Sequence, residues 1–128
     1  MSFMDKRIFG DFEDIQTLED LSEALERLLY SGCYVWDDGK LINAKQLVAR
    51  EKGLKIEIYP DEHAPPHFHV KSADINASFT ITECIMIQGS INRKDEDLVK
   101  YWHSKFKEKL IDVWNKTRPS NCPVGAIT

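Results

Sequence analysis

The sequence of 128 residues has a formal net charge of −4, with 42% hydrophobic and 30% charged residues, a composition typical of one globular domain. No apolar run approaches the roughly 20 residues that a membrane-spanning helix needs, and residues 1–10 carry Asp5, Lys6 and Arg7 where a signal peptide would be apolar. The three cysteines are widely spaced and odd in number, which argues against a disulfide framework or a cysteine-based zinc site, so we expect a cytoplasmic protein.

Charge is distributed unevenly along the chain. Residues 1–30 hold eight acids and three bases, whereas residues 99–118 hold six bases and two acids. Both regions can be interpreted as solvated helix faces that keep the protein soluble. Alternatively, the basic region meets an acidic partner or nucleic acid.

The N-terminal part of the chain, residues 1–53, predicts an extension that begins with an irregular arm. Residues 1–16 mix aromatic and charged side chains without a clean hydrophobic period. Thr17 is a typical helix N-cap, and the leucines that follow it at helical spacing predict a short amphipathic helix that closes at Gly32.

Two further elements are predicted before the extension ends. The dipeptide Asp38-Gly39 tolerates the positive φ angles of a tight turn and predicts a β-hairpin over residues 34–42. Asn43 offers another N-cap, for a short helix over residues 44–52.

Residues 54–118 predict an α+β core, and residues 119–128 an irregular tail. Asn92 caps a helix, Asp95–Asn115, whose apolar residues recur every three or four positions and must pack on a sheet. Alternating apolar residues predict an antiparallel meander of three to four strands, over residues 54–58, 67–71, 77–81 and 85–87. The sequence therefore predicts one structural domain of the α+β class, with a small antiparallel sheet, an N-terminal hairpin and a long C-terminal amphipathic helix.

The most unusual segment is His63-Ala-Pro-Pro-His67-Phe-His69, which places three of the four histidines within seven residues. Imidazole binds transition metals and moves protons near neutral pH. Pro65 and Pro66 fix their φ angles and supply no backbone N–H, so the segment before His67 is a stiff, non-helical loop that leads into a strand.

Strand alternation divides the side chains around this motif between two faces. Phe68 and Val70 form an apolar face, which we expect to pack on the last helix. The opposite face would then gather polar side chains from two neighbouring strands: Glu57, Tyr59, His67, His69 and Lys71. The reverse assignment would turn the histidines towards His103, which lies on the apolar side of the last helix either as a hydrogen-bonded core residue or as a site residue.

The motif and its surroundings resemble a known family. The preceding strand, the His-x-Pro-Pro-His-x-His pattern at residues 63–69, and a final helix ending in Leu110 and Trp114 are similar to the bacterial and phage domain-of-unknown-function family 4160. The resemblance covers residues 54–118 and implies a small α+β domain with a link to toxin–antitoxin-like gene pairs. Residues 1–53 lie outside it.

The first hypothesis for the motif is a metal site. His63, His67 and His69 would supply three nitrogens to zinc or another divalent transition metal and leave one position open for water. Asp61 or Glu62 would orient a ligand or act as a base.

The second hypothesis is a hydrolase, namely a metal-free ribonuclease toxin. His67 and His69 would act as general base and acid on the RNA 2′-OH, and Lys71 with Arg93 would stabilise the developing phosphorane charge. The acidic total charge argues against RNA as a partner.

The third hypothesis gives the histidines a structural role. They would hydrogen-bond to backbone carbonyls and neighbouring carboxylates in a rigid corner. The protein would then be a non-enzymatic, antitoxin-like module that meets another protein through its last helix or its acidic N-terminal helix.

Overall fold

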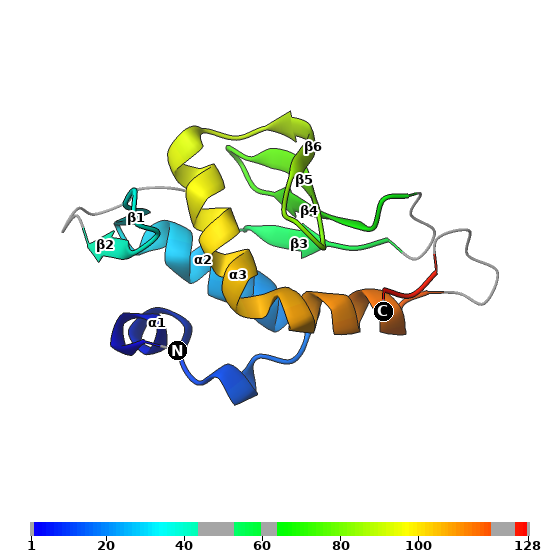
Figure 1. Ribbon diagram of the computed structural model, residues 1–128, viewed down its shortest axis with the longest axis horizontal. Coiled ribbons are helices and arrows are strands. Elements are labelled where there is room, and N and C mark those ends of the chain that lie inside the picture. The colour runs from blue at the N-terminus through cyan, green and yellow to red at the C-terminus, as the bar shows by residue number, and fades with distance from the viewer. Residues whose placement is uncertain (1, 44–52, 60–63, 119–124, 128) are drawn as a thin grey trace.

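The computed structural model describes residues 2–43, 53–59, 64–118 and 125–127. The fold is α+β, as predicted, with two antiparallel sheets and a long C-terminal helix (Figure 1). Its elements in chain order are α1 (Phe3–Phe9), the 3₁₀ helix η1 (Phe12–Asp14), α2 (Leu18–Tyr30), β1 (Cys33–Val35), β2 (Leu41–Asn43), β3 (Lys55–Glu57), β4 (His67–Lys71), β5 (Asn76–Thr80), β6 (Met86–Ser90) and α3 (Arg93–Lys116).

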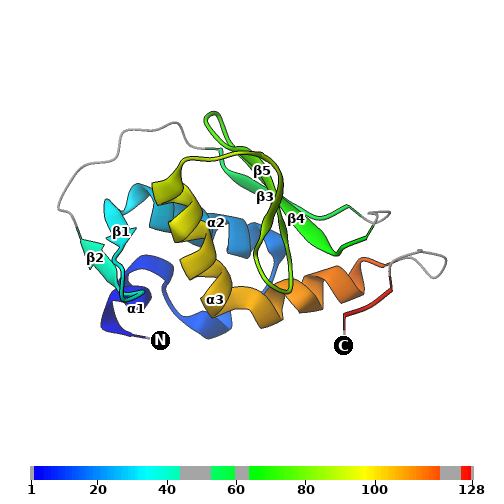
Figure 2. The ribbon, with the colours of Figure 1, turned by 45° about the horizontal axis from the view of Figure 1, so that its top comes forward.

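The predicted meander is confirmed. Strands β3, β4, β5 and β6 pair in chain order, each antiparallel to the next, and β1 pairs with β2 in a separate hairpin. Figure 2 shows the larger sheet above α2 and α3, with α1 and the hairpin at one end of these helices. The predicted helix over residues 44–52 and most of the predicted tail lie outside the described residues.

Helix α3 is held against the sheet by aromatic contacts with β4. The rings of Phe68 and Trp102 have centroids 5.7 Å apart, and both residues are fully buried. Phe79 of β5 stacks on Phe68 at 5.7 Å, so one ring of β4 contacts both the neighbouring strand and the helix. The N-cap is Asn92, as predicted, with its side chain accepting from the Asp95 N–H at 2.8 Å.

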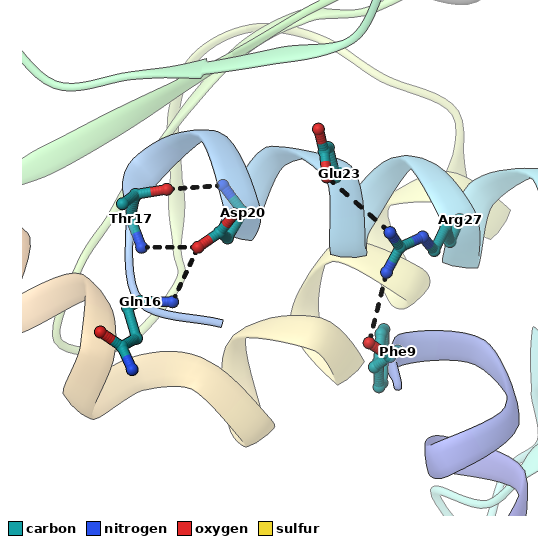
Figure 3. Close-up of polar contacts among 6 residues, drawn as sticks. All are labelled: Phe9, Gln16, Thr17, Asp20, Glu23 and Arg27. Carbon is teal, nitrogen blue, oxygen red and sulfur yellow. Dashed lines mark hydrogen bonds and ion pairs between the residues drawn. The ribbon is translucent and has the colours of Figure 1, made fainter. Parts of the chain in front are cut away.

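Helix α2 joins the same hydrophobic core. Thr17 caps it as predicted, in a reciprocal capping box with Asp20 (Figure 3). Leu21, Leu25 and Leu28 are fully buried, and the Leu21 carbonyl accepts a hydrogen bond from the Trp102 indole N–H at 3.2 Å. None of the helices in the described part of the chain combines the length and the apolar character that a membrane crossing needs.

The prediction of an irregular N-terminal arm is wrong, because residues 3–9 form α1. Ser2 and Asp5 make a capping box at its start. Only one large side chain of this short helix is fully inserted in the core: Phe9 is 1% exposed and meets Phe106 edge-on at 5.1 Å. Arg27 of α2 donates to the Phe9 carbonyl at 3.3 Å (Figure 3). The other fully buried position is the charged Asp5, and Met4 and Ile8 are only partly buried against the core, so the pattern of residues 1–16 did not reveal this helix.

Candidate functional site

The polar side of β3, β4 and β5 carries the candidate site, and its innermost residue is His67. This residue opens β4 and is 2% exposed. Its Nδ1 lies 2.7 Å from the Pro65 carbonyl oxygen. A carbonyl oxygen only accepts hydrogen bonds, so Nδ1 carries the hydrogen, and in the neutral ring the lone pair is on Nε2.

His69 is the second imidazole on this side of the sheet. Its ring lies 4.9 Å from that of His67, centroid to centroid, at an interplanar angle of 70°. Its Nδ1 is 2.9 Å from the hydroxyl oxygen of Ser78, which is directly opposite His69 in the β4–β5 register. Tyr59 packs on its other side, with ring centroids 4.8 Å apart. Both imidazoles are therefore fixed through their Nδ1 atoms and lie next to each other.

A chain of hydrogen bonds links three further side chains beside His69. Lys71 Nζ donates to the Tyr59 hydroxyl at 2.9 Å, and this hydroxyl donates to Glu57 Oε2 at 2.6 Å. The hydrogen bond from Tyr59 lowers the pKa of the Glu57 carboxyl, and the hydrogen bond to Tyr59 raises the pKa of the Lys71 ammonium. Lys71 and Glu57, 3.7 Å apart, are therefore both charged at neutral pH and compensate each other.

These side chains form what we name the histidine face: Glu57, Tyr59, His67, His69, Lys71 and Ser78. The first five come together as strand alternation predicted. Ser78 was missed, because the register between β4 and β5 cannot be deduced from periodicity. The predicted third ligand His63, with Asp61 and Glu62, lies outside the described residues.

The reverse assignment of the two strand faces is wrong. His103 lies on the opposite side of β4, where its ring stacks on Phe68 at 6.4 Å, and its Nε2 donates to the Ile81 carbonyl oxygen at 2.5 Å. Burial lowers the pKa of His103, which is 7% exposed. Of its two predicted roles, the structure supports the hydrogen-bonded core histidine.

A metal site can be tested only within the described residues. Among them, no group of three or more histidine, cysteine, aspartate or glutamate side chains is placed to hold an ion. His67 and His69 are two of the three predicted ligands, and His63 is not among the residues tested. The predicted ligand set therefore stays a prediction.

Much of the basic region of α3 contacts the rest of the chain. Lys109 Nζ donates to the carbonyls of Phe12 and Ile15 and lies 4.0 Å from the centroid of the Phe12 ring. Lys105 pairs with the buried Asp5 at 3.6 Å. These two lysines hold the N-terminal helices on α3, so their charges serve the fold rather than a nucleic-acid platform.

Arg118, next to the C-terminal end of α3, connects this helix to the histidine face. Its guanidinium stacks 3.4 Å from the centroid of the Trp114 ring and donates to the Tyr59 carbonyl at 2.8 Å. The end of α3 thereby fixes the backbone of a residue whose side chain contacts His69.

Comparison with known proteins identifies a family but no activity. Residues 53–115 match the family model described as a domain of unknown function, DUF4160. The match coincides with the region in which the sequence resembled that family. No curated protein and no solved structure matches the chain.

Proposed function

The chain carries a DUF4160 domain over residues 53–115, and we propose that this domain binds a divalent transition metal, zinc or a similar ion, at the histidine face. His67 and His69 would bind it through Nε2, and His63, four residues before His67 in the sequence, is the proposed third ligand. The observation that carries the proposal is the hydrogen bond of 2.7 Å from His67 Nδ1 to the Pro65 carbonyl.

This hydrogen bond matters because it selects the tautomer. A metal-binding histidine usually donates its other ring N–H to a carbonyl or carboxylate, which orients the ring and makes the binding nitrogen more basic. His67 has this arrangement, and His69 has its own Nδ1 contact with Ser78. The two ring centroids lie 4.9 Å apart, so Nε2 atoms of both rings could bind one ion, provided that His69 donates its Nδ1 hydrogen to Ser78 as His67 does to Pro65.

The burial of His67 also supports the role of a metal ligand. At 2% exposure, His67 is shielded from bulk solvent. A small ion can reach such a position more easily than a polymer substrate can. Lys71, the cation of the histidine face, is compensated by Glu57 at 3.7 Å. The local charge therefore does not oppose a bound divalent ion.

The experiment is calorimetric titration of the untagged protein with zinc sulfate. We expect uptake of about one equivalent by the wild type, and His67→Ala or His69→Ala should weaken binding by roughly 100-fold or more. His103→Gln is the matched control, because it removes an imidazole from the other side of the sheet and should leave zinc binding unchanged. Absence of stoichiometric uptake by the wild type would refute the proposal.

A second candidate function, metal-free acid–base catalysis on RNA, is favoured by the position of Lys71 and Tyr59. An ammonium and a phenol beside His69 could stabilise a developing phosphorane while His67 and His69 exchange protons with the substrate. The test is RNA cleavage in excess EDTA. Cleavage that persists there and is lost in both His69→Ala and Lys71→Met would favour this function, and an inactive wild type would exclude it.

A further inference from the structure

The outer edge of the larger sheet is unusually open. Strand β6 is the last in the order β3-β4-β5-β6, and all five of its residues are exposed. Ile85, Met86 and Ile87 are 51%, 37% and 42% exposed, so apolar side chains are solvated on consecutive positions. An edge strand directs every second N–H and C=O away from its neighbour, which makes it a template for another strand.

The opposite edge of the same sheet is protected. Strand β3 has only three residues and carries charges at both ends, Lys55 and Glu57. Helix α2 covers its backbone as well: Ser22 Oγ accepts from the Ile56 N–H at 2.9 Å, and Glu26 accepts from the N–H groups that precede the strand. These are devices by which proteins keep a sheet edge from pairing.

The segment around β6 has none of the charges that protect an edge. Residues 84–92 are uncharged in a chain in which 30% of residues are charged. The first charges beyond the segment are Glu83 on one side and Arg93 on the other, each five residues from Gln88, the middle residue of β6. The acid and the base are therefore placed symmetrically about the centre of the strand.

This symmetry fits a second copy of the same chain. When two identical strands pair antiparallel about a two-fold axis, each residue before the axis faces the residue equally far behind it in the partner. With the axis at Gln88, Met86 of one copy faces Ser90 of the other, and Ile87, which the irregular β5–β6 register leaves without a partner on β5, faces Gly89. Glu83 lies in the turn before β6 and Arg93 is the first residue of α3, so the turn that carries the acid in one copy lies on the same side as the helix start that carries the base in the other.

We propose that two copies of this protein pair their β6 strands antiparallel, edge to edge, about a two-fold axis at Gln88. The two sheets join into one continuous sheet, and the exposed apolar side chains of β6 become cross-strand neighbours. The proposal depends on the edge strand and its flanking charges, not on the histidine face, so it stands or falls independently of metal binding.

Sedimentation equilibrium over a concentration series tests the proposal. The wild type should be a dimer at tens of micromolar, and Gln88→Lys, which places two like charges together on the axis, should raise the dimer dissociation constant at least tenfold. Ile42→Lys is the matched control, since Ile42 is 36% exposed on the hairpin, and it should leave the dimer intact. A monomeric wild type, or a dimer equally tight in Gln88→Lys, would overturn the proposal.

Exchanging the charges of Glu83 and Arg93 tests how the two β6 strands are aligned. Glu83→Arg should weaken the dimer several-fold, because arginine would then meet Arg93 of the partner subunit, and adding Arg93→Glu should restore it. Both residues are exposed, so circular dichroism should show an unchanged fold. If the double variant is no tighter than Glu83→Arg alone, the axis does not lie at Gln88.

Discussion

The two faces of β4 differ completely although they belong to the same five residues. On one face, Phe68 and Val70 are fully buried, and Phe68 contacts rings of β5 and α3. On the other face, His67, His69 and Lys71 each make polar contacts with groups on β3, on β5 or in the preceding loop. The first face is fully explained by the burial of apolar surface.

The second face is not explained in this way. His67 is 2% exposed, yet an imidazole gains less from burial than an aliphatic side chain and needs a hydrogen-bond partner there. The apolar face is therefore held by packing, whereas the histidine face is held by specific polar contacts, and the proposed metal site is one reason to keep imidazoles there.

The largest expected effect on stability comes from a substitution on the apolar face of β4. Phe68→Ala removes a fully buried ring that contacts Phe79, Trp102 and His103, so we expect a loss of about 3–5 kcal/mol in the free energy of unfolding. Urea denaturation followed by tryptophan fluorescence measures it, because Trp102 lies in the same cluster.

The adjacent residue on the other face provides the control. His69→Ala should cost only about 1 kcal/mol, since it removes one partly buried polar contact with Ser78 and leaves the core intact. Equal costs for Phe68→Ala and His69→Ala would mean that both faces serve stability and that the contrast between them has no functional meaning.

The second prediction compares histidines on the two sides of the sheet. Because burial lowers the pKa of His103, the folded protein binds this proton less well than the unfolded chain does. The neutral His103 ring therefore contributes fully to stability above the ordinary histidine pKa of about 6.5. This contribution is lost as the pH falls through the lower pKa of the folded state. This loss should be smaller than that caused by Phe68→Ala.

Imidazole NMR titration and unfolding at a series of pH values measure this effect. The His103 resonance should titrate below pH 6.5, and His103→Gln should flatten the dependence of stability on pH below this value. A His103 ring that titrates at or above its ordinary pKa would show that it is not the buried core residue described above.

The faces of β4 were predictable from sequence because strand alternation is a local rule. Residues 54–58 and 67–71 alternate cleanly, and burying Phe68 automatically directs His67 and His69 to the other side. The caps Thr17 and Asn92 are local signals as well, and both are confirmed.

Long-range partners were not predictable, since nothing local encodes them. Alternation within β5 leaves Ser78 on the polar side, but its place opposite His69 is a matter of register. Asp5 is fully buried because the Tyr101 hydroxyl, 96 residues away, donates to it at 2.5 Å. The Ser2–Asp5 capping box and the C-cap Gly10 were local signals for α1, and the irregular hydrophobic pattern concealed them.

The smallest expected effect concerns the edge of the histidine face. Glu57→Gln keeps an oxygen that can accept from the Tyr59 hydroxyl but removes the charge that pairs with Lys71. Because the hydrogen bond from Tyr59 lowers the pKa of Glu57, the carboxylate contributes stability above its ordinary pKa and loses it as the pH falls through the lower folded value. The Glu57 side chain is 32% exposed, so we expect Glu57→Gln to cost less than about 1 kcal/mol at neutral pH.

Comparing wild type and Glu57→Gln at two pH values isolates this contribution from the other carboxylates. The difference in the free energy of unfolding should be present at pH 7 and should shrink as the pH falls below the ordinary glutamate pKa and the Glu57 carboxylate takes up a proton. A difference that stays constant would assign the loss to packing.

The same variant also tests the proposed zinc site. Glu57→Gln leaves Lys71 as an uncompensated cation beside His69, so the affinity of the protein for zinc should fall several-fold while the apolar face of β4 is unaffected.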